Sequence, residues 1–518
     1  MNRKLPFLDF DAQSSSPQYL ENLATGYWFS EVLFTSVEMD LFSQLEPDGA
    51  ALEDLAASLD VNPAALYRFL HALVSVGLIT RHNDRYFNAG ISHDYLVPGK
   101  EHYQGNAILW KKYLRTHWEG LTDCLKSGGR TNYSNQDDSV VRSGRIRKYI
   151  SAMDCIARTK GQEILRFFEG LSIKGNLIDI GAGSGAIAAA FLMQYPDLSG
   201  TFLDLPEVLD YTKIFMREKA FNSKAHYCAG NILETWPVKM GSFDLVILSN
   251  IIHAYSEKEL PHIIAMAVNA LNKEGILLIH DFFFEHYPEK AALSDLNMFI
   301  NTFNGKVFSG AAIQERLHGL GLSNTTLIPL ETDTAIIVAS GNASAIRSLH
   351  VDPVSRLISK TQTMGFSKVR LLKTEDITVA EWAALKCRYG CDRYGSPSCP
   401  PNSPEPEKTR SILKEYRHAL LLEGQPPTRD FQQRVLQVEK EAFVSGFPKA
   451  FSFWAGPCSL CDPCVGAGGK CRNIADARPS MEGAGIDVFE TARLAGARLR
   501  TLKNKTDFIK YYGLILLE

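Results

Sequence analysis

The sequence lacks a long hydrophobic run. No stretch of its 518 residues approaches the roughly 18 uninterrupted apolar residues of a transmembrane helix, so no membrane span is expected. The N-terminal stretch MNRKLPFLDFDAQSSS has neither an apolar core nor a cleavage site of small residues, so no signal peptide is predicted. We therefore expect a cytoplasmic protein without a membrane partner.

An excess of positive charge is also absent. The 55 Lys and Arg residues are outnumbered by 58 Asp and Glu residues, which gives a formal net charge of −3. Proteins that hold nucleic acid by its phosphates need a basic surface. We therefore expect no nucleic-acid partner.

Cysteine is scarce along most of the chain. Of ten cysteines, only Cys124, Cys155 and Cys228 precede residue 387, and the other seven lie between Cys387 and Cys471. In a reducing compartment such a cluster indicates metal ligands before disulfides.

The length suggests about three domains. Residues 1–100 are predicted to form the first, in which two helices, the second opening at Asn62-Pro63, precede a short hairpin, as in a winged helix. DNA binding is one interpretation of this pattern. The second helix offers only Arg68 and His71 as basic groups, so we favour a dimerisation module.

Residues 101–342 are predicted to form the second domain. Its first part is helical and aromatic, and from Asn176 short apolar runs alternate with helical stretches, which predicts a parallel α/β sheet. The last two runs, NTTLIPL and TAIIVAS, predict a terminal hairpin. A linker is expected at Ser340–Ser344, and residues 345–518 are expected to form an α+β domain that holds the cysteine cluster.

The segment Asp179-Ile-Gly-Ala-Gly-Ser-Gly185 lies between the apolar run NLIDI and the helical run AIAAAFLMQY. Glycines allow the backbone to approach a ligand closely. A second acid, Asp204, ends the next predicted strand, where it can accept both ribose hydroxyls of an adenosine cofactor. A nicotinamide dinucleotide site is an alternative, but its G-x-G-x-x-G spacing is absent, and the turn could also lack a ligand.

Residues 17–340 resemble the dimeric small-molecule O-methyltransferases, a group that includes caffeate, hydroxyindole and polyketide O-methyltransferases. The matching stretches are DIGAGSG, FLDLPEVL, FDLVILSNIIHAYSEKEL and GILLIHDFF. The resemblance implies a homodimer and a Rossmann-like class I methyltransferase fold that binds S-adenosyl-L-methionine. It also implies a cofactor site made of Asp179, Gly181, Gly183, Gly185, Asp204, Leu205, Asn231, Ile232 and Ser249.

The same resemblance points to His253 as the catalytic base, in the stretch Ile252-His-Ala-Tyr255. A neutral imidazole can take the proton of an acceptor while the methyl group is transferred. The alternative is a histidine that only packs after the strand. Asp281 is a candidate for the carboxylate that orients the imidazole.

The acceptor pocket is expected between the central helices and the cofactor. Its candidate lining residues could equally pack in the core. They are Trp110, His117, Met153, Asn297 and Phe299.

The late cysteines form two groups, Cys387, Cys391 and Cys399, and then Cys458, Cys461, Cys464 and Cys471. The C-x2-C-x2-C triple of the second group favours iron–sulfur, most simply [4Fe–4S], over zinc. The first group could be completed by another kind of ligand, leave one iron open, or share a site with the second. Residues 350–518 also resemble a family of predicted metal-binding proteins, through CRYGCDRYGSPSCPP, FWAGPCSLCDPCVGAGGKCRN and RPSMEGAGIDVFETA.

The sequence therefore predicts an S-adenosylmethionine-dependent methyltransferase of a small-molecule O or S acceptor, whose iron–sulfur domain binds or gates that acceptor. The alternative is an electron-transfer or metal-sensing protein with a regulatory cofactor domain.

Overall fold

The computed structural model describes residues 17–131, 139–218, 224–349, 351–362, 364–424, 429–497, 499 and 510–518. The chain divides into two compact units, with the boundary after residue 350. None of the described helices has the length and apolar character that a membrane crossing requires.

The first unit begins with a small helical module. Asn62 caps helix α5, since its side chain accepts a hydrogen bond from the Ala65 N–H at 3.0 Å, and an antiparallel hairpin follows, as predicted. The elements are α1 (Pro17–Ala24), α2 (Tyr27–Glu38), α3 (Leu41–Gln44), β1 (Ala50–Ala51), α4 (Leu52–Ser58), α5 (Pro63–Ser75), β2 (Ile79–His82), β3 (Arg85–Asn88) and α6 (Gly90–Tyr95).

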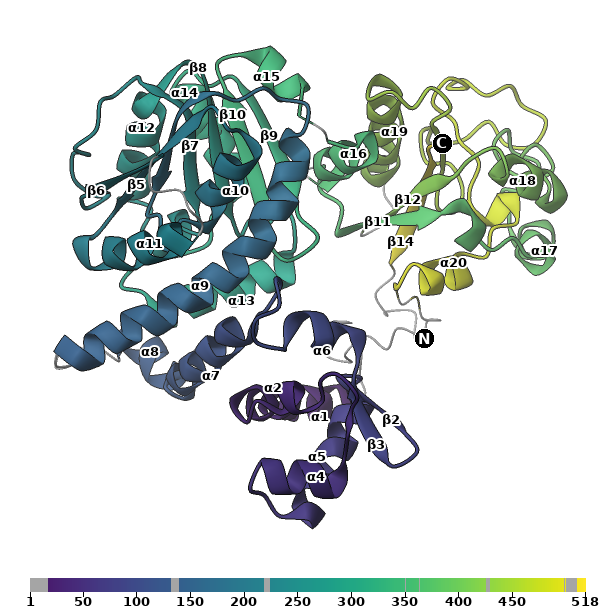
Figure 1. Ribbon diagram of the computed structural model, residues 1–518. Coiled ribbons are helices and arrows are strands. Elements are labelled where there is room, and N and C mark those ends of the chain that lie inside the picture. The colour runs from purple at the N-terminus through teal and green to yellow at the C-terminus, as the bar shows by residue number, and fades with distance from the viewer. Residues whose placement is uncertain are drawn as a thin grey trace. The chain divides into compact units, whose positions relative to one another are not determined.

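Three helices lead to the sheet: α7 (Gly105–Glu119), α8 (Leu121–Ser127) and the long α9 (Ser139–Phe168), which packs against α7. The sheet has the order β6-β5-β4-β7-β8-β10-β9, with helices on both faces (Figure 1). Its strands are β4 (Gly175–Ile180), β5 (Leu198–Asp204), β6 (Ala225–Ala229), β7 (Phe243–Ser249), β8 (Leu271–Asp281), β9 (Asn324–Pro329) and β10 (Ala335–Ser340).

Strands β4 to β8 are parallel, and β10 pairs antiparallel with β8 and β9, so the predicted α/β sheet and terminal hairpin are confirmed. The helices between them are α10 (Ala186–Gln194), α11 (Pro206–Glu218), η2 (Ile252–Ala254), α12 (Leu260–Ala270), α13 (Pro288–Asn301) and α14 (Gly310–Gly319). One hydrophobic core joins α12 and α14 to the sheet.

The predicted linker at Ser340–Ser344 has a regular structure instead. Ser340 ends β10 and is fully buried, and helix α15 (Ala343–Arg347) follows and packs on β10. The Asn342 side chain accepts a hydrogen bond from the Ser344 N–H at 2.9 Å and so caps this helix. Small polar residues are as typical of helix caps as of linkers, which explains the difference.

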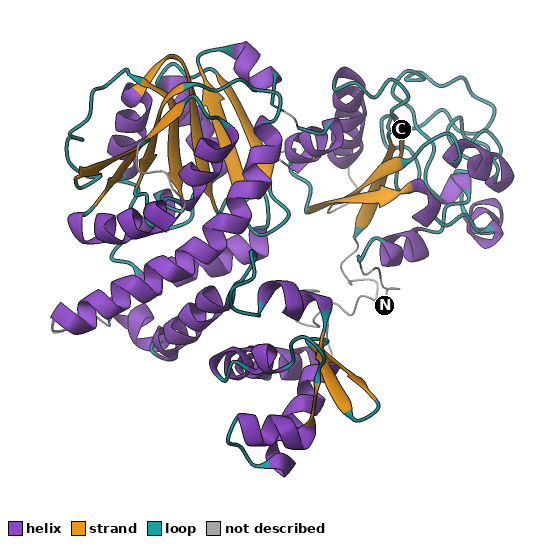
Figure 2. Cartoon of the chain, in the orientation of Figure 1, coloured by secondary structure: helices purple, strands orange, loops and turns teal. Residues whose placement is uncertain are grey.

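The second unit is α+β. Its antiparallel sheet has the order β11-β12-β14-β13, and loops make up much of the rest (Figure 2). Alternate residues of the central strands enter two cores: Leu421 and Leu514 lie in one, Leu420 and Ile515 in the other. The elements are α16 (Pro353–Gln362), β11 (Lys368–Lys373), η3 (Thr374–Asp376), α17 (Glu381–Gly390), α18 (Pro406–Leu413), β12 (His418–Gly424), α19 (Arg429–Val444), β13 (Phe451–Phe453), η4 (Glu482–Ala484), α20 (Val488–Leu494) and β14 (Tyr511–Leu516).

Candidate active site and cysteine loop

The glycine turn joins β4 to α10 and is clamped by neighbouring side chains. The Asp204 Oδ2 atom accepts a hydrogen bond from the Gly183 N–H at 2.9 Å, and Oδ1 accepts one from the Leu205 N–H at 2.7 Å. Thr212, which the sequence reasoning missed, donates its hydroxyl to the Gly183 carbonyl at 2.6 Å. Asp204 therefore fixes the turn and keeps lone pairs for further donors.

Two glycines of the turn differ in the space around them. Both have left-handed backbone, with φ of 55° at Gly183 and 74° at Gly185. A Cβ at Gly185 would lie 2.7 Å from the Phe202 ring, whereas a Cβ at Gly183 would meet only Ile150, at 4.0 Å. Gly185 is thus needed for packing, while Gly183 faces open space.

Asp179 lies inside β4 and is 3% exposed. Burial, and then the negative charge of Asp204, raise its pKa to about 8. The Ala188 N–H donates to its carboxylate. In the described part of the chain, the Asp179 side chain is therefore hydrogen-bonded to α10, the helix that follows the glycine turn.

The remaining cofactor candidates lie along the carboxyl ends of the parallel strands. The Gly230 N–H donates to the Asp204 carbonyl at 3.0 Å, which places Asn231 beside Asp204, and the Asn231 side chain accepts from the Leu233 N–H at 3.0 Å. Leu205 is 43% exposed, Ile232 is buried in the core, and the Ser249 hydroxyl lies 2.9 Å from His280 Nδ1.

Tyr255 is a second group near Asp204. Burial raises its pKa to about 12, and the negative charges of Asp204 and Glu259 and the Tyr149 phenol add to the effect. Its phenol is therefore a neutral hydrogen-bond donor at the edge of this site. The sequence offered only its place two residues after His253 as a signal.

His253 and Asp281 meet because β7 and β8 are neighbouring parallel strands: His253 lies in η2, the short helix that follows the carboxyl end of β7, and Asp281 is the last residue of β8. His253 Nδ1 is 2.5 Å from Asp281 Oδ1, and the His253 N–H donates to Asp281 Oδ2 at 3.3 Å. The imidazole is 14% exposed and the carboxylate fully buried. No hydrogen bond to His253 Nε2 is formed by the described residues, so that nitrogen is available for an acceptor.

The acceptor candidates are only partly brought together. His117 Nδ1 lies 2.6 Å from Asn301 Oδ1, and the Asn301 amide donates to Asn297 Oδ1 at 2.9 Å, so the structure joins His117 and Asn297 through a residue not predicted. Trp110 stacks on Tyr113 and contacts Tyr149. Met153 on α9 and Phe299 on α13 are half-buried.

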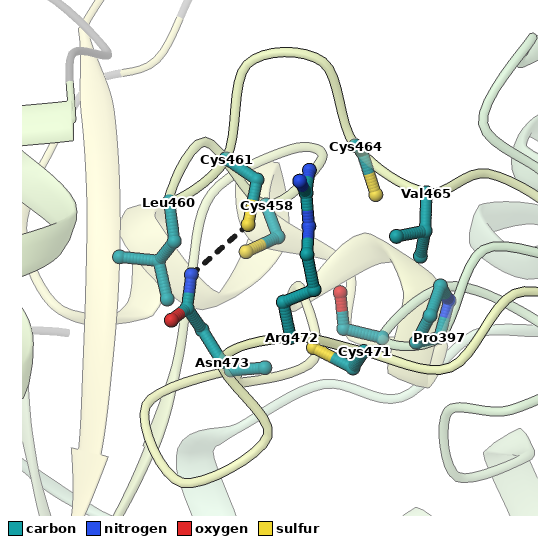
Figure 3. Close-up of a pocket in the computed structure, with 11 residues that line it drawn as sticks. Pro397, Cys458, Leu460, Cys461, Cys464, Val465, Cys471, Arg472 and Asn473 are labelled. Carbon is teal, nitrogen blue, oxygen red and sulfur yellow. Dashed lines mark hydrogen bonds between the residues drawn. The ribbon is translucent and has the colours of Figure 1, made fainter.

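The second cysteine group lies in the cysteine loop, residues 455–481. Its four cysteines line one pocket together with Pro397, Ser398 and Arg472, and their sulfur atoms are turned toward this pocket (Figure 3). All ten cysteines of the chain are free thiols. Four thiols around one small cavity suit a thiolate-bound metal.

Two side chains donate N–H groups to these sulfurs. The Asn473 amide donates to Cys461 Sγ at 3.0 Å, and the Gln432 amide donates to Cys458 Sγ at 3.4 Å. Gln432, on α19, also accepts from the Ser459 N–H at 2.8 Å. Such donors are the outer partners that tune thiolate ligands, and neither was predicted.

The first group lies close to the second. Burial raises the pKa of Cys399 to about 11, and the nearby thiols that add to the shift belong to both groups: Cys391, Cys387, Cys458 and Cys464. No three His, Cys, Asp or Glu side chains in the described ranges are close enough to share one metal ion. The thiols are thus gathered, without the coordination shell that the sequence predicted.

Three known protein families match separate parts of the chain. Residues 21–98 match the O-methyltransferase dimerisation domain and residues 119–323 the O-methyltransferase domain. Residues 370–517 match the family described as predicted metal-binding protein. A 3-hydroxy-5-methyl-1-naphthoate 3-O-methyltransferase of Streptomyces sahachiroi is 26% identical over 331 residues, which cover 63% of this chain and 95% of that protein.

This chain is an S-adenosylmethionine-dependent methyltransferase.

Two further comparisons bear on the methyltransferase. The N,N-dimethyltransferase OxyT of Streptomyces rimosus is 27% identical over 274 residues, 51% of this chain and 77% of that protein. The crystal structure of human N-acetylserotonin methyltransferase in complex with SAM matches with a TM-score of 0.56 at 21% identity, over 64% of this chain and all of that one. The methyltransferase therefore has the predicted class I fold.

Proposed function

We propose that the protein transfers a methyl group to an oxygen or sulfur atom of a small molecule, with His253 as general base. The contact of His253 with Asp281 carries this proposal. A buried carboxylate at Nδ1 keeps the proton on that nitrogen, so Nε2 can accept the proton of an acceptor. Asp281 is a positioning residue, because it acts through His253.

The cofactor would lie against the glycine turn. Gly183 leaves space for the methyl donor, and the free lone pairs of Asp204 suit ribose hydroxyls. Leu205 follows Asp204 in the chain, and Asn231 lies beside Asp204 on the neighbouring strand end. S-adenosylmethionine supplies an electrophilic methyl group there. Ile232, which is buried in the core beside Asn231, and Ser249, at the end of β7, would complete the cofactor site.

The choice of acceptor atom is the less constrained part. The naphthoate relative is named for O-methylation and OxyT for N-methylation, so the fold serves several nucleophiles. An imidazole base serves acceptors that lose a proton, such as phenols and thiols. We therefore favour O or S, with Trp110, His117, Met153, Asn297 and Phe299 around the acceptor.

The second unit would hold an iron–sulfur cluster of the [4Fe–4S] type through Cys458, Cys461, Cys464 and Cys471. The shared pocket and the N–H donors to two of the sulfurs support a thiolate site. Zinc is the alternative metal. We propose that this unit binds or gates the acceptor.

The dimerisation-domain match supports a homodimer. Helices α1 and α2 carry four large apolar side chains that are at least half exposed: Leu20, Leu23, Tyr27 and Trp28. A second copy of the chain would cover them.

Anaerobic titration calorimetry and a transfer assay test the proposal. The full chain is titrated with S-adenosylmethionine, and label from its methyl group is then followed into catechol, dithiothreitol or inorganic sulfide. Saturable binding and transfer to one of these probes are expected. Absence of cofactor binding by folded protein would overturn the enzyme assignment, and transfer that is independent of His253 would overturn its role as base.

A further inference from the structure

His280 is a fully buried polar residue near the end of a strand that is apolar before it. It follows Ile276, Leu277, Leu278 and Ile279 in β8, and all four are buried. A buried imidazole is costly unless its ring nitrogens find hydrogen-bond partners. The proposed methyl transfer does not use His280, so its presence in this strand needs another reason.

The two ring nitrogens contact hydroxyl groups on opposite sides. Nδ1 lies 2.9 Å from Ser249 Oγ, and Nε2 lies 3.0 Å from Thr334 Oγ1. Ser249 ends β7 and Thr334 precedes β10, so the ring joins the two strands that flank β8 in the sheet. Thr334 is 5% exposed, so this end of the arrangement is closed to solvent.

The imidazole is neutral near neutral pH. Burial lowers the pKa of His280 to about 4, and the negative charge of Asp281 opposes this only in part. One ring nitrogen therefore carries a proton and the other accepts one. A serine hydroxyl has one proton and two lone pairs, so Ser249 Oγ keeps a free lone pair with either tautomer of His280. Among the described residues, no other hydrogen bond to Ser249 Oγ is formed.

The chain that follows Ser249 is held by His280 as well. The Asn250 N–H donates to the His280 carbonyl at 2.8 Å. Asn250 has left-handed backbone, with φ of 55°, which is uncommon for a residue other than glycine. Ile251 then packs on the glycine turn, since a Cβ at Gly181 would overlap its side chain. His280 thus fixes the side chain of Ser249 and the backbone beside it.

Ser249 lies on the side of the glycine turn that is nearer to the proposed base. Strands β4 and β7 are parallel neighbours, so the turn that begins at Gly181 runs beside Ser249. Asp204, which would hold the ribose, ends β5 on the other side of β4. The methyl group has to reach His253, which follows β7. The methionyl part of the cofactor would therefore extend from Asp204 across the turn toward Ser249.

We propose that His280 is a positioning residue, which holds Ser249 Oγ as the hydrogen-bond acceptor for the α-ammonium group of S-adenosylmethionine. The inference rests on the proposed function, because it takes the cofactor to lie against the glycine turn. A hydrogen bond from a charged donor is roughly twice as strong as one between neutral groups, so a fixed acceptor adds affinity at the amino-acid end. The neutral ring of His280 does not repel the ammonium group.

Two ligands separate the amino-acid end from the nucleoside. S-adenosylhomocysteine has the ammonium group, whereas methylthioadenosine has the same thioether nucleoside without it. Calorimetry on the full-length protein measures the dissociation constants of both for wild type, Ser249→Ala and His280→Gln. The glutamine amide reaches the position of Nε2 and leaves Ser249 without its partner. Both variants should bind S-adenosylhomocysteine roughly tenfold more weakly, through loss of one charge-assisted hydrogen bond, and methylthioadenosine as wild type does.

His280→Asn is the conservative variant, because its amide lies where Nδ1 lies and can still contact Ser249. It should bind S-adenosylhomocysteine more tightly than His280→Gln does, which a residue that only fills space would not cause. Combining Ser249→Ala with His280→Gln should lose no more affinity than Ser249→Ala alone. His318→Asn is the matched control with unchanged affinity, since His318 also lies 3.1 Å from a threonine hydroxyl, that of Thr325, but is exposed on α14.

The outcomes separate this inference from the proposed function. Equal weakening of both ligands in His280→Gln would overturn the inference, because it would reveal a general disturbance of the turn. Normal affinity of His280→Gln for S-adenosylhomocysteine would overturn it as well. If wild type itself binds neither ligand, the cofactor site of the proposed function fails first and this inference fails with it.

Discussion

His253 Nδ1 lies 2.5 Å from Asp281 Oδ1, and the two residues lie at the same end of neighbouring strands, His253 in the short helix η2 after β7 and Asp281 at the end of β8. The carboxylate also accepts the Phe282 N–H at 2.8 Å, so its position is fixed by backbone as well as by the imidazole. The orientation of the ring is therefore set before any substrate arrives.

Replacing His253 by Ala should lower kcat by roughly 100-fold or more, the range typical of a lost general base. Cofactor affinity should stay near that of wild type, because no hydrogen bond among the described residues joins His253 to the glycine turn. Label transfer and calorimetry on the same preparation measure both. Full activity of His253→Ala would assign the histidine to packing.

Asp281→Asn tests the positioning role separately. The amide keeps a hydrogen bond to the ring but no longer favours the proton on Nδ1, so kcat should fall while KM changes little. The pH at which activity rises should also move, which a merely structural residue would not cause. An unchanged pH profile together with lost activity would point to misfolding, which circular dichroism checks.

The glycine turn gives a matched pair of substitutions. Gly183→Ala should cost roughly 1–2 kcal/mol of folding free energy for the left-handed backbone and should weaken cofactor binding at least about tenfold, because the new methyl group enters the open space. Gly185→Ala should destabilise the fold more, because its Cβ meets Phe202. Thermal melts and calorimetry measure the two effects, and tight cofactor binding by Gly183→Ala would contradict the site.

Asp179 makes stability depend on pH. Its pKa in the folded protein is about 8, above the ordinary value of 3.8, so the folded state holds the proton more tightly than the unfolded state does. Its stabilising contribution is complete below about pH 4 and is lost as pH rises toward 8.

The variant Asp179→Asn should remove this loss. Its side chain still accepts from the Ala188 N–H, and it has no proton to release. Between pH 5 and 8 the folding free energy of wild type should weaken relative to that of the variant by on the order of a few kcal/mol. The melting temperature of wild type should fall accordingly. Parallel curves for the two proteins would show that Asp179 does not titrate in this range.

Asn473→Ala should change the electronic properties of the iron–sulfur cluster that we propose for the cysteine loop. The N–H donated to Cys461 Sγ stabilises negative charge on sulfur, so its removal should lower the reduction potential. Redox titration of reconstituted protein measures this. Asn402→Ala is a control, since the Asn402 side chain donates to the backbone carbonyls of Gly395 and Ser396 and forms no hydrogen bond to a cysteine sulfur among the described residues.

Trp28→Glu should weaken the dimer, because it places a charge on the exposed apolar surface of α1 and α2. Sedimentation velocity should show a larger share of monomer, with unchanged circular dichroism. An equal dimer content in variant and wild type would locate the interface elsewhere.

Much of the fold could be predicted because it depends on local signals. Alternating apolar runs indicated the parallel sheet, and Asn62-Pro63 marked the start of α5. The contact of His253 with Asp281 was suggested only as one option, because strand order, which the sequence does not state, decides which carboxylate comes near.

Other site residues carry no local signal at all. Gln432 lies on a helix 26 residues before the sulfur that it contacts. Thr212 likewise reaches the turn from the middle of α11. Their roles depend on tertiary packing, so they appear only in the structure.

Gln432 is buried in α19, the helix that packs on β13 and β14, and it also holds the loop at Ser459. The position of the thiols that we propose as metal ligands is therefore coupled mechanically to the hydrophobic core of the second unit. Metal binding by those thiols, or their oxidation, should therefore change the stability of the whole sheet. We expect this unit to unfold cooperatively, at a temperature that depends on its metal content.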